Sequence, residues 1–231
     1  MMMNHQCGVV IVAAGGGTRM GEGPPKQYRE LLGIPLFLWP VRFFNAQDCV
    51  SEIVIVAPSG DEERIINICR VDGMNKVARV TAGGVRRQDS VAAGIAALSE
   101  NVSIAAVHDA ARPFPPSDFA DAVQSAGQYG AVIYAARISE TIKRAGKDLL
   151  IEETIDRENL WGAQTPQIFQ RSKLEDALRF CQTAKQLLTD EALTMEVAGY
   201  EVKIIPAPRT NIKVTTSDDW PLAEAMARCR S

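Results

Sequence analysis

The chain has 231 residues, of which 46% are hydrophobic, enough for one large α/β domain with a sizeable core. Its formal net charge of -3 gives no global basic field, which argues against a nucleic-acid polymer as partner. Five scattered cysteines without C-x-x-C spacing argue against disulfides and structural zinc, and no apolar run could span a membrane, so we expect a cytoplasmic protein.

Predicted strands and helices alternate along the chain. Apolar, β-branched runs predict strands at residues 8–12, 53–57, 77–81, 104–107, 131–136 and 201–205. Helical spacing predicts helices at residues 35–47, 61–70, 91–98, 118–126, 171–184, 191–197 and 218–228. Ser117 and Ser217 are the predicted N-caps of two of these helices. The alternation predicts an α/β fold, a Rossmann-like, mostly parallel sheet with helices on both faces, in one domain over residues 1–231.

Residues 138–161, which we call the arm, break this alternation. Apolar and polar side chains alternate there on both sides of the turn Gly146-Lys147-Asp148, which predicts a projecting β-hairpin. A lone hairpin is only marginally stable in water. We therefore expect the arm to pack on something else, such as another subunit.

The first strand runs into the triplet Gly15–Gly17, followed by Arg19 and, behind a Pro-Pro pair, Lys26. Glycines let backbone N–H groups approach phosphate oxygens, and the two cations add positive charge. The Walker A pattern fails because Gly-Thr-Arg stands where Gly-Lys-Ser/Thr is required, and the dinucleotide pattern fails because Met20 replaces its third glycine. For the glycines alone, a plain connection between elements is an equal alternative. Arg19 and Lys26 favour an extended polyphosphate-binding loop.

A second glycine pair follows the strand at residues 77–81, and Arg86, Arg87 and Ser90 come shortly after it. Backbone groups and a hydroxyl at this position could read a base or a ribose. The signal is weak, because the same residues could simply begin a helix.

Asp109 follows the strand at residues 104–107 and stands beside Arg112. A single carboxylate at a strand end suits Mg²⁺ held together with phosphate oxygens, or a sugar hydroxyl. A surface Asp-Arg pair is the alternative. The neighbouring His108 has no partner at metal-ligand spacing and is interpreted as a buried, hydrogen-bonded core residue. Since parallel strands end at a common edge, the three loops are predicted to meet there.

No Ser-His-Asp order or activated cysteine is evident, which leaves phosphoryl or nucleotidyl transfer, a chemistry that depends on positioning and positive charge. Lys213 and Arg157 contribute only if the fold brings them to the glycine loop. A lysine on a strand edge is more often solvated.

Several motifs in one order resemble a single family, that of 2-C-methyl-D-erythritol 4-phosphate cytidylyltransferase, from Val9 to about Ala227. They are A-A-G-G-G-T-R-M, P-K-Q-Y, R-R-Q-D-S-V, H-D-A-A-R-P, T-I-D-R, T-P-Q-I-F, T-D-E-A and N-I-K-V-T. The resemblance implies a nucleotidyltransferase that transfers CMP from CTP to methylerythritol phosphate, giving CDP-methylerythritol and pyrophosphate in non-mevalonate isoprenoid biosynthesis. It also implies Mg²⁺ as cofactor and a homodimer that exchanges its arms.

The resemblance also implies the roles of individual residues. The catalytic cations would be Arg19, Lys26 and Lys213. The CTP-binding residues would be Ala13, Ala14, Gly15, Gly16, Gly17, Gly83, Arg86, Ser90, Asp109 and Ala110, with Asp109 also a metal ligand. The substrate-binding residues would be Arg112, Thr141, Arg157, Thr165 and Thr189. Two alternatives stay open, a ribitol-5-phosphate cytidylyltransferase and a nucleotide-binding regulator that has lost catalysis.

Overall fold

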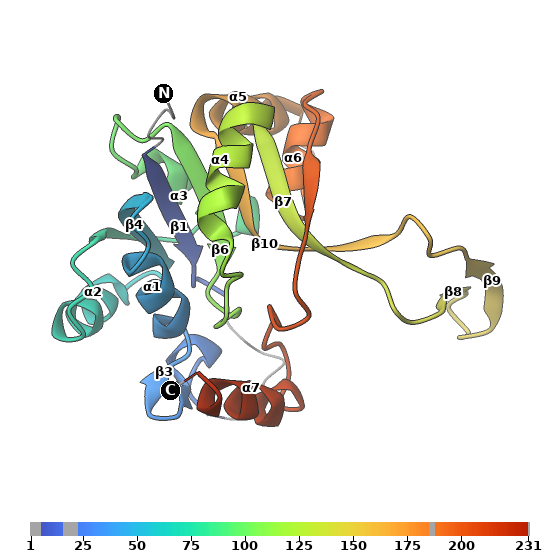
Figure 1. Ribbon diagram of the computed structural model, residues 1–231, viewed down its shortest axis with the longest axis horizontal. Helices are drawn as coiled ribbons and strands as arrows, with labels where there is room; N and C mark the ends of the chain where they lie inside the picture. Colours follow the sequence, from blue (N-terminus) through green and yellow to red (C-terminus); the bar gives the residue numbers. More distant parts are fainter. Residues whose placement is uncertain (1–5, 16–22, 185–187, 231) are drawn as a thin grey trace.

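The structure is a computed structural model that describes residues 6–15, 23–184 and 188–230. Its central sheet has seven strands: β1 (Cys7–Val12), β4 (Val50–Ala57), β5 (Val77–Ala82), β6 (Ile104–Asp109), β7 (Ala131–Arg137), β10 (Trp161–Gln170) and β11 (Lys203–Pro206). They lie in the order β11-β7-β10-β6-β1-β4-β5 (Figure 1). Strand β10 is antiparallel to β6 and β7, and the other neighbours are parallel. The predicted mostly parallel α/β sheet is confirmed.

Helices cover both faces of this sheet. One face carries α1 (Leu38–Asn45), α2 (Glu62–Val71) and α4 (Phe119–Tyr129), and the other carries α3 (Arg87–Ala96), α5 (Arg171–Ala184) and α6 (Glu191–Val197). Successive side chains of a strand point to opposite faces, so Val9 and Ile11 of β1 join one apolar core and Val10 joins the other. Covering both faces requires strands that are apolar throughout, and this is why β1 and β4 are nearly continuous apolar runs in the sequence.

A third, smaller apolar cluster lies beside the sheet and joins segments from both ends of the chain. The 3-10 helix η2 (Lys26–Tyr28) leads into the short antiparallel strands β2 (Glu30–Leu31) and β3 (Ile34–Pro35), and α7 (Asp219–Arg228) packs nearby. The buried members of this cluster are Leu31, Leu36, Phe114, Val214, Ala223 and Ala227. The cluster therefore brings the segment of Lys26 next to the segment of Lys213.

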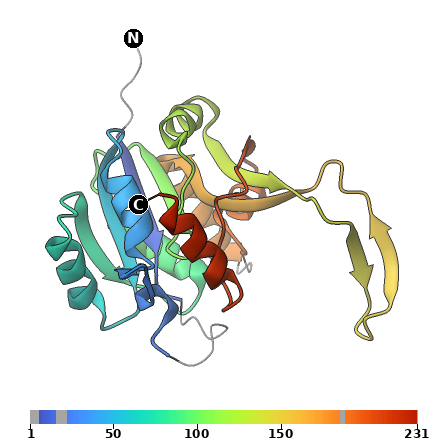
Figure 2. The ribbon, with the colours of Figure 1, turned by 60° about the horizontal axis from the view of Figure 1, so that its bottom comes forward.

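The arm is a hairpin of β8 (Ile142–Ala145) and β9 (Ile151–Ile155), as predicted. It projects well away from the sheet (Figures 1 and 2). Its tip exposes Leu149, Leu150 and Ile151, with 84%, 67% and 65% of their surface accessible. Exposed apolar side chains on a hairpin without a packing partner suit a surface that binds another molecule.

The prediction of Ser117 and Ser217 as N-caps is wrong. Helices α4 and α7 have Asp118 and Asp218 at the N-cap position, and neither side chain makes a capping hydrogen bond. Serine and aspartate have similar N-cap preferences, so adjacent candidates cannot be ranked from sequence. No helix in the described part of the chain is long and apolar enough to cross a membrane.

Candidate active site

The three unusual loops meet at the carboxyl edge of the sheet, around a cavity of about 420 Å³. It is lined by the ends of β1 and β6, by the loop from β5 to α3, and by two segments outside the sheet that contain Lys26 and Lys213. Of the predicted site residues, Ala13, Ala14, Gly15, Lys26, Arg86, Ser90, Asp109, Ala110 and Lys213 line this cavity. The fold thus converges residues that are up to 200 positions apart in sequence (213 minus 13).

Asp109 is the carboxylate in the cavity that three basic side chains share. Its Oδ2 lies 2.6 Å from Nζ of Lys213 and 4.0 Å from Nε of Arg112, and its Oδ1 lies 3.4 Å from Nη2 of Arg87. Burial alone would raise the pKa of Asp109, but Lys213 and Arg87 together hold it well below its usual range. Asp109 is therefore an anion at neutral pH, enclosed by three cations.

Lys26 and Lys213 reach the cavity from neighbouring segments. Nζ of Lys26 donates a hydrogen bond of 2.9 Å to the carbonyl oxygen of Val214, next to Lys213. The N–H of Val214 donates to the carbonyl oxygen of Ala111 at 2.8 Å, which fixes this segment to the end of β6. The side chain of Lys213 is 41% exposed, so its ammonium group is accessible to a ligand. Two lysines at one cavity give a strong attraction for phosphate oxygens.

The second glycine pair is required by close packing. A Cβ on Gly83 would lie 2.4 Å from Cβ of Ala14, and one on Gly84 would lie 2.4 Å from Cβ of Asp89. The hydroxyl of Ser90 accepts a hydrogen bond from the N–H of Gly84 at 3.1 Å. These glycines thus let the β5–α3 loop lie against the first glycine loop, and Gly84 rather than Gly83 lines the cavity.

Comparison with known proteins identifies the family of the chain. A model of the family described as 2-C-methyl-D-erythritol 4-phosphate cytidylyltransferase matches residues 7–229. The chain belongs to this family. A cytidylyltransferase of that name from Pelotomaculum thermopropionicum is 40% identical over 224 residues, which cover 96% of this chain and 94% of the relative. Another from Geobacillus kaustophilus is 39% identical over 229 residues, with 99% of each chain covered.

Solved structures agree with this assignment. The crystal structure of the 2-C-methyl-D-erythritol 4-phosphate cytidylyltransferase of Francisella tularensis matches with a TM-score of 0.78 and 29% identity. The match covers 96% of this chain and 99% of that chain. As a member of the family, the chain is a cytidylyltransferase, and its described cavity can be interpreted as a nucleotide site.

His108 and Thr165 lie behind Asp109, outside the lining of this cytidylyltransferase's cavity. His108 is fully buried, and burial lowers its pKa to about 4, so its ring is neutral at pH 7. Nε2 of His108 lies 3.0 Å from the carbonyl oxygen of Arg112 and must carry the proton, so Nδ1 accepts from the hydroxyl of Thr165 at 3.2 Å. The same hydroxyl accepts from the N–H of Asp109 at 3.0 Å. His108 is the hydrogen-bonded core residue that the sequence predicts, and with Thr165 it fixes the backbone of Asp109.

Arg112 lies behind the cavity wall. Its side chain is buried, and Nη1 donates to the carbonyl oxygen of Asn211 at 2.7 Å. Nε of Arg112 has no hydrogen-bond partner in the described part of the chain. The charge of Arg112 therefore acts on Asp109, but its side chain is not among the groups that line the cavity.

The structure does not bring every predicted site residue to the cavity. Thr141 and Arg157 belong to the arm, and Nη1 of Arg157 donates to the carbonyl oxygen of Ser139. Thr189 is exposed just before α6. None of the three lines the cavity of the same chain. The predicted Gly16, Gly17 and Arg19 lie outside the described residues.

Two residues of the site, Gln27 and Glu191, were missed from the sequence, and Arg87 was noted after the second glycine pair but was given no role of its own. Arg87 and Gln27 line the cavity, and buried Glu191 lies behind Arg87. Gln27 is 4% exposed, and its Nε2 has no hydrogen-bond partner among the described residues. The P-K-Q-Y motif contains Gln27, but the adjacent Lys26 drew the prediction, and of the two arginines in R-R-Q-D-S-V the resemblance assigned a role only to Arg86.

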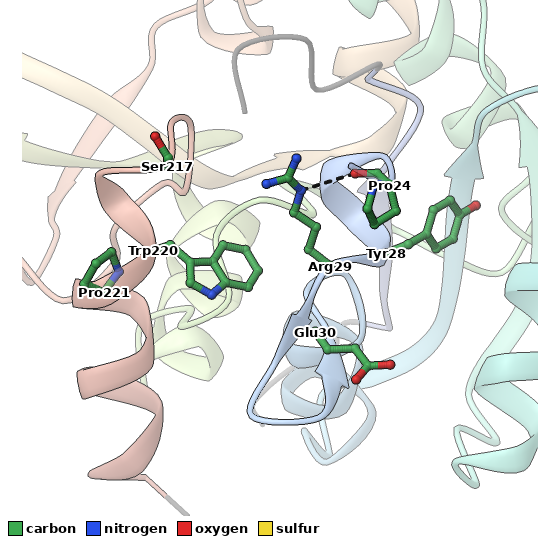
Figure 3. A pocket seen from close by; sticks show the side chains of 7 residues that line it. All are labelled: Pro24, Tyr28, Arg29, Glu30, Ser217, Trp220 and Pro221. Carbon is green, nitrogen blue, oxygen red and sulfur yellow. Dashed lines mark hydrogen bonds between the residues drawn. The ribbon is translucent and has the colours of Figure 1, made fainter. Parts of the chain in front are cut away.

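A wider groove of about 670 Å³ lies outside the active site, between η2–β2 and the start of α7. Figure 3 shows the indole of Trp220 on one side and the guanidinium of Arg29 on the other, with Nε of Arg29 donating to the carbonyl oxygen of Pro24 at 3.2 Å. None of the predicted site residues lines this groove. Size alone would therefore select the wrong cavity.

Proposed function

We propose that this chain transfers CMP from CTP to 2-C-methyl-D-erythritol 4-phosphate, with release of pyrophosphate, in the synthesis of isoprenoid precursors. One observation carries the proposal: this member of the family gathers Lys26, Lys213 and the ionised Asp109 at one cavity on the carboxyl edge of the sheet. The five cysteines are free in the structure, which fits the cytoplasmic location that we also propose.

The reaction forms one phosphorus–oxygen bond and breaks another. A phosphate oxygen of the acceptor attacks the α-phosphorus of CTP, and the bond from that phosphorus to the bridging oxygen breaks, so that pyrophosphate leaves with the electron pair. Negative charge grows on the α-phosphate oxygens and on the leaving group. Lys26 and Lys213 are cations at the cavity where this charge would develop, so their contribution would be electrostatic.

We also propose Mg²⁺ as the cofactor. No group of three or more His, Cys, Asp or Glu side chains in the described part of the chain could hold a metal ion. Asp109, an ionised carboxylate in the cavity wall, still suits Mg²⁺, which typically takes one or two carboxylates and completes its shell with phosphate oxygens and water. The ion would reduce the charge repulsion between the two phosphate-bearing substrates.

An acceptor panel tests the reaction. We expect pyrophosphate release when the full chain is incubated with CTP, Mg²⁺ and methylerythritol phosphate, and a much lower kcat/KM with ribitol 5-phosphate. Excess chelator should stop the reaction, and added Mg²⁺ should restore it. Faster turnover of ribitol 5-phosphate would overturn the acceptor assignment, and no pyrophosphate with either acceptor would indicate a regulator without catalysis.

We further propose that the chain acts as a homodimer in which the arm reaches the partner's cavity. Arg157 lies on the arm rather than at the cavity of its own chain. The exposed apolar tip of the arm is the kind of surface that a second copy would cover.

Arg157→Ala is expected to raise KM for the acceptor about tenfold to a hundredfold, since a hydrogen bond to a charged group is worth about 1.5–3 kcal/mol. The affinity for CTP should stay near that of the wild type. Steady-state kinetics and equilibrium CTP binding measure the two effects. Arg144→Ala is the matched control, because Arg144 is an exposed arginine of the arm paired with Glu153.

Mixed dimers decide whether the arm acts in trans. Neither Arg157→Ala nor Lys213→Ala homodimers have an intact site, but a mixed dimer would have one, with Lys213 from one subunit and Arg157 from the other. We expect mixing of the two variants to restore activity. If mixed dimers form and stay as inactive as the variants alone, the arm does not serve the partner's cavity.

A further inference from the structure

Arg87 is shared between two carboxylates from different parts of the fold. Nη1 and Nη2 of Arg87 donate to the two carboxylate oxygens of Glu191, at 2.5 and 3.0 Å, and Nη2 also lies 3.4 Å from Oδ1 of Asp109. The side chain of Glu191 is 3% exposed and that of Arg87 is 29% exposed. Arg87 therefore faces the cavity with Asp109 in front of it and the buried carboxyl group of Glu191 behind it.

Glu191 is held firmly at the start of α6. The preceding Asp190 is the N-cap, and its carboxylate accepts a hydrogen bond from the N–H of Leu193 at 3.0 Å. Gln167 of β10 donates to the same carboxylate and accepts from the N–H of Ala192, both at 2.9 Å. The planar guanidinium can make a bidentate contact only in one orientation, so the fixed Glu191 also fixes Arg87.

We propose that Arg87 and Glu191 are positioning residues that hold the carboxylate of Asp109 in its working orientation when Lys213 engages the substrate. The proposal rests on the function proposed above. In the structure, Nζ of Lys213 donates a hydrogen bond to Oδ2 of Asp109 from the exposed side of the cavity. When Lys213 turns to a phosphate, Asp109 loses its shortest contact. Arg87, anchored by Glu191, stays on Oδ1 and leaves Oδ2 available to the ligand.

An alternative is that the pair only joins α3 to α6. Burying an ion pair is seldom a strong source of stability, because removing the charges from water costs about as much as their attraction returns. A hydrophobic contact would join two helices as well. The contact from Arg87 to Asp109 and its place in the cavity lining indicate a role in the site.

Three variants of the full chain test the proposal: Arg87→Gln, Glu191→Gln and the double variant. Each should be assayed well below its own unfolding midpoint, with kcat, both KM values and the equilibrium Kd for CTP as readouts. We expect Arg87→Gln to lower kcat about a hundredfold, the loss typical of a misplaced catalytic group, with a smaller change in CTP affinity. Because both residues act through one carboxylate, the double variant should lose no more than Arg87→Gln alone.

Arg171→Gln is the matched control. Arg171 begins α5, its side chain is 15% exposed, and its Nε lies 2.8 Å from Oε1 of Glu175. It also donates to the carbonyl oxygen of Ser99 and does not line the cavity. We expect this variant to lower the unfolding midpoint and to leave kcat unchanged. A lowered midpoint with unchanged kcat in Arg87→Gln as well would overturn the positioning role.

The outcomes separate the two proposals. If the wild type releases pyrophosphate and Arg87→Gln is as fast, only the positioning role fails. Strictly additive losses in the double variant would overturn it too, since they would mean independent actions. If the wild type releases no pyrophosphate, the proposed function fails, and the Kd for CTP still tests Arg87: weaker binding in Arg87→Gln than in Arg171→Gln supports the positioning role, and equal binding refutes it.

Discussion

Lys213→Ala is expected to lower kcat by about a hundredfold to a thousandfold, the effect of removing one preorganised charge contact, about 2.7–4 kcal/mol in the transition state. The ammonium of Lys213 is exposed at the cavity and lies 2.6 Å from Asp109. It can therefore move to a phosphate group without breaking a buried contact. The loss should appear in kcat more than in CTP affinity, because the charge that Lys213 would stabilise builds up during bond formation.

Two comparisons make this prediction about Lys213 specific. Lys203→Ala removes a lysine from β11, where Nζ lies 3.5 Å from the centre of the Tyr129 ring and far from the cavity lining, so kcat should not change. Lys213→Arg keeps the charge but replaces a compact ammonium by a planar fork, and it should recover only part of the activity. A rate for Lys213→Ala within a few-fold of the wild type would refute a catalytic role.

The sequence predicts six of the seven strands of the sheet, all except β10, because the physical signal of those six is local. Strands covered on both faces must be apolar along their whole length, and such runs mark β1, β4 and β6 directly. The place of the site follows from one further rule, that loops at the carboxyl ends of parallel strands share an edge. These two rules are enough to predict that Lys26, Asp109 and the glycine loops belong to the site, because neither rule requires knowledge of a long-range contact.

Residues whose role depends on long-range contacts cannot be predicted in this way. Arg87 and Glu191 are 104 positions apart, and nothing local connects them. A glutamate at the first position of a helix is common because it interacts favourably with the helix dipole, so Glu191 gave no separate signal. Arg86 and Arg87 are identical and adjacent, yet Arg86 pairs with Asp89 at the rim of the cavity while Arg87 enters it. Only the direction in which α3 begins decides which of the two side chains points to Asp109.

The same limit applies to Arg112 and Thr165. Their places in the H-D-A-A-R-P and T-P-Q-I-F motifs imply substrate binding, but both are buried and bonded behind Asp109. The motif locates these residues near the site. It does not say whether a side chain faces the ligand or supports a neighbour that does.

Lys26→Ala is expected to lower kcat by at least about a hundredfold, because Lys26 would act on the triphosphate directly and also supports Lys213. Its Nζ donates to the carbonyl oxygen of Val214, whose N–H is held in turn by Ala111. Removing the side chain therefore deletes a charge and releases one side of the segment that carries Lys213. Steady-state kinetics with saturating CTP and acceptor measure the combined loss.

Lys26→Gln separates the charge from the support. The glutamine amide can still donate toward the Val214 carbonyl but carries no charge. If the charge dominates, as we expect, Lys26→Gln should be nearly as slow as Lys26→Ala, and a rate close to the wild type would assign Lys26 to support alone. The Lys26→Ala/Lys213→Ala double variant completes the test. Because part of the effect of Lys26 passes through Lys213, we expect the double variant to lose less transition-state stabilisation than the sum of the losses in the two single variants.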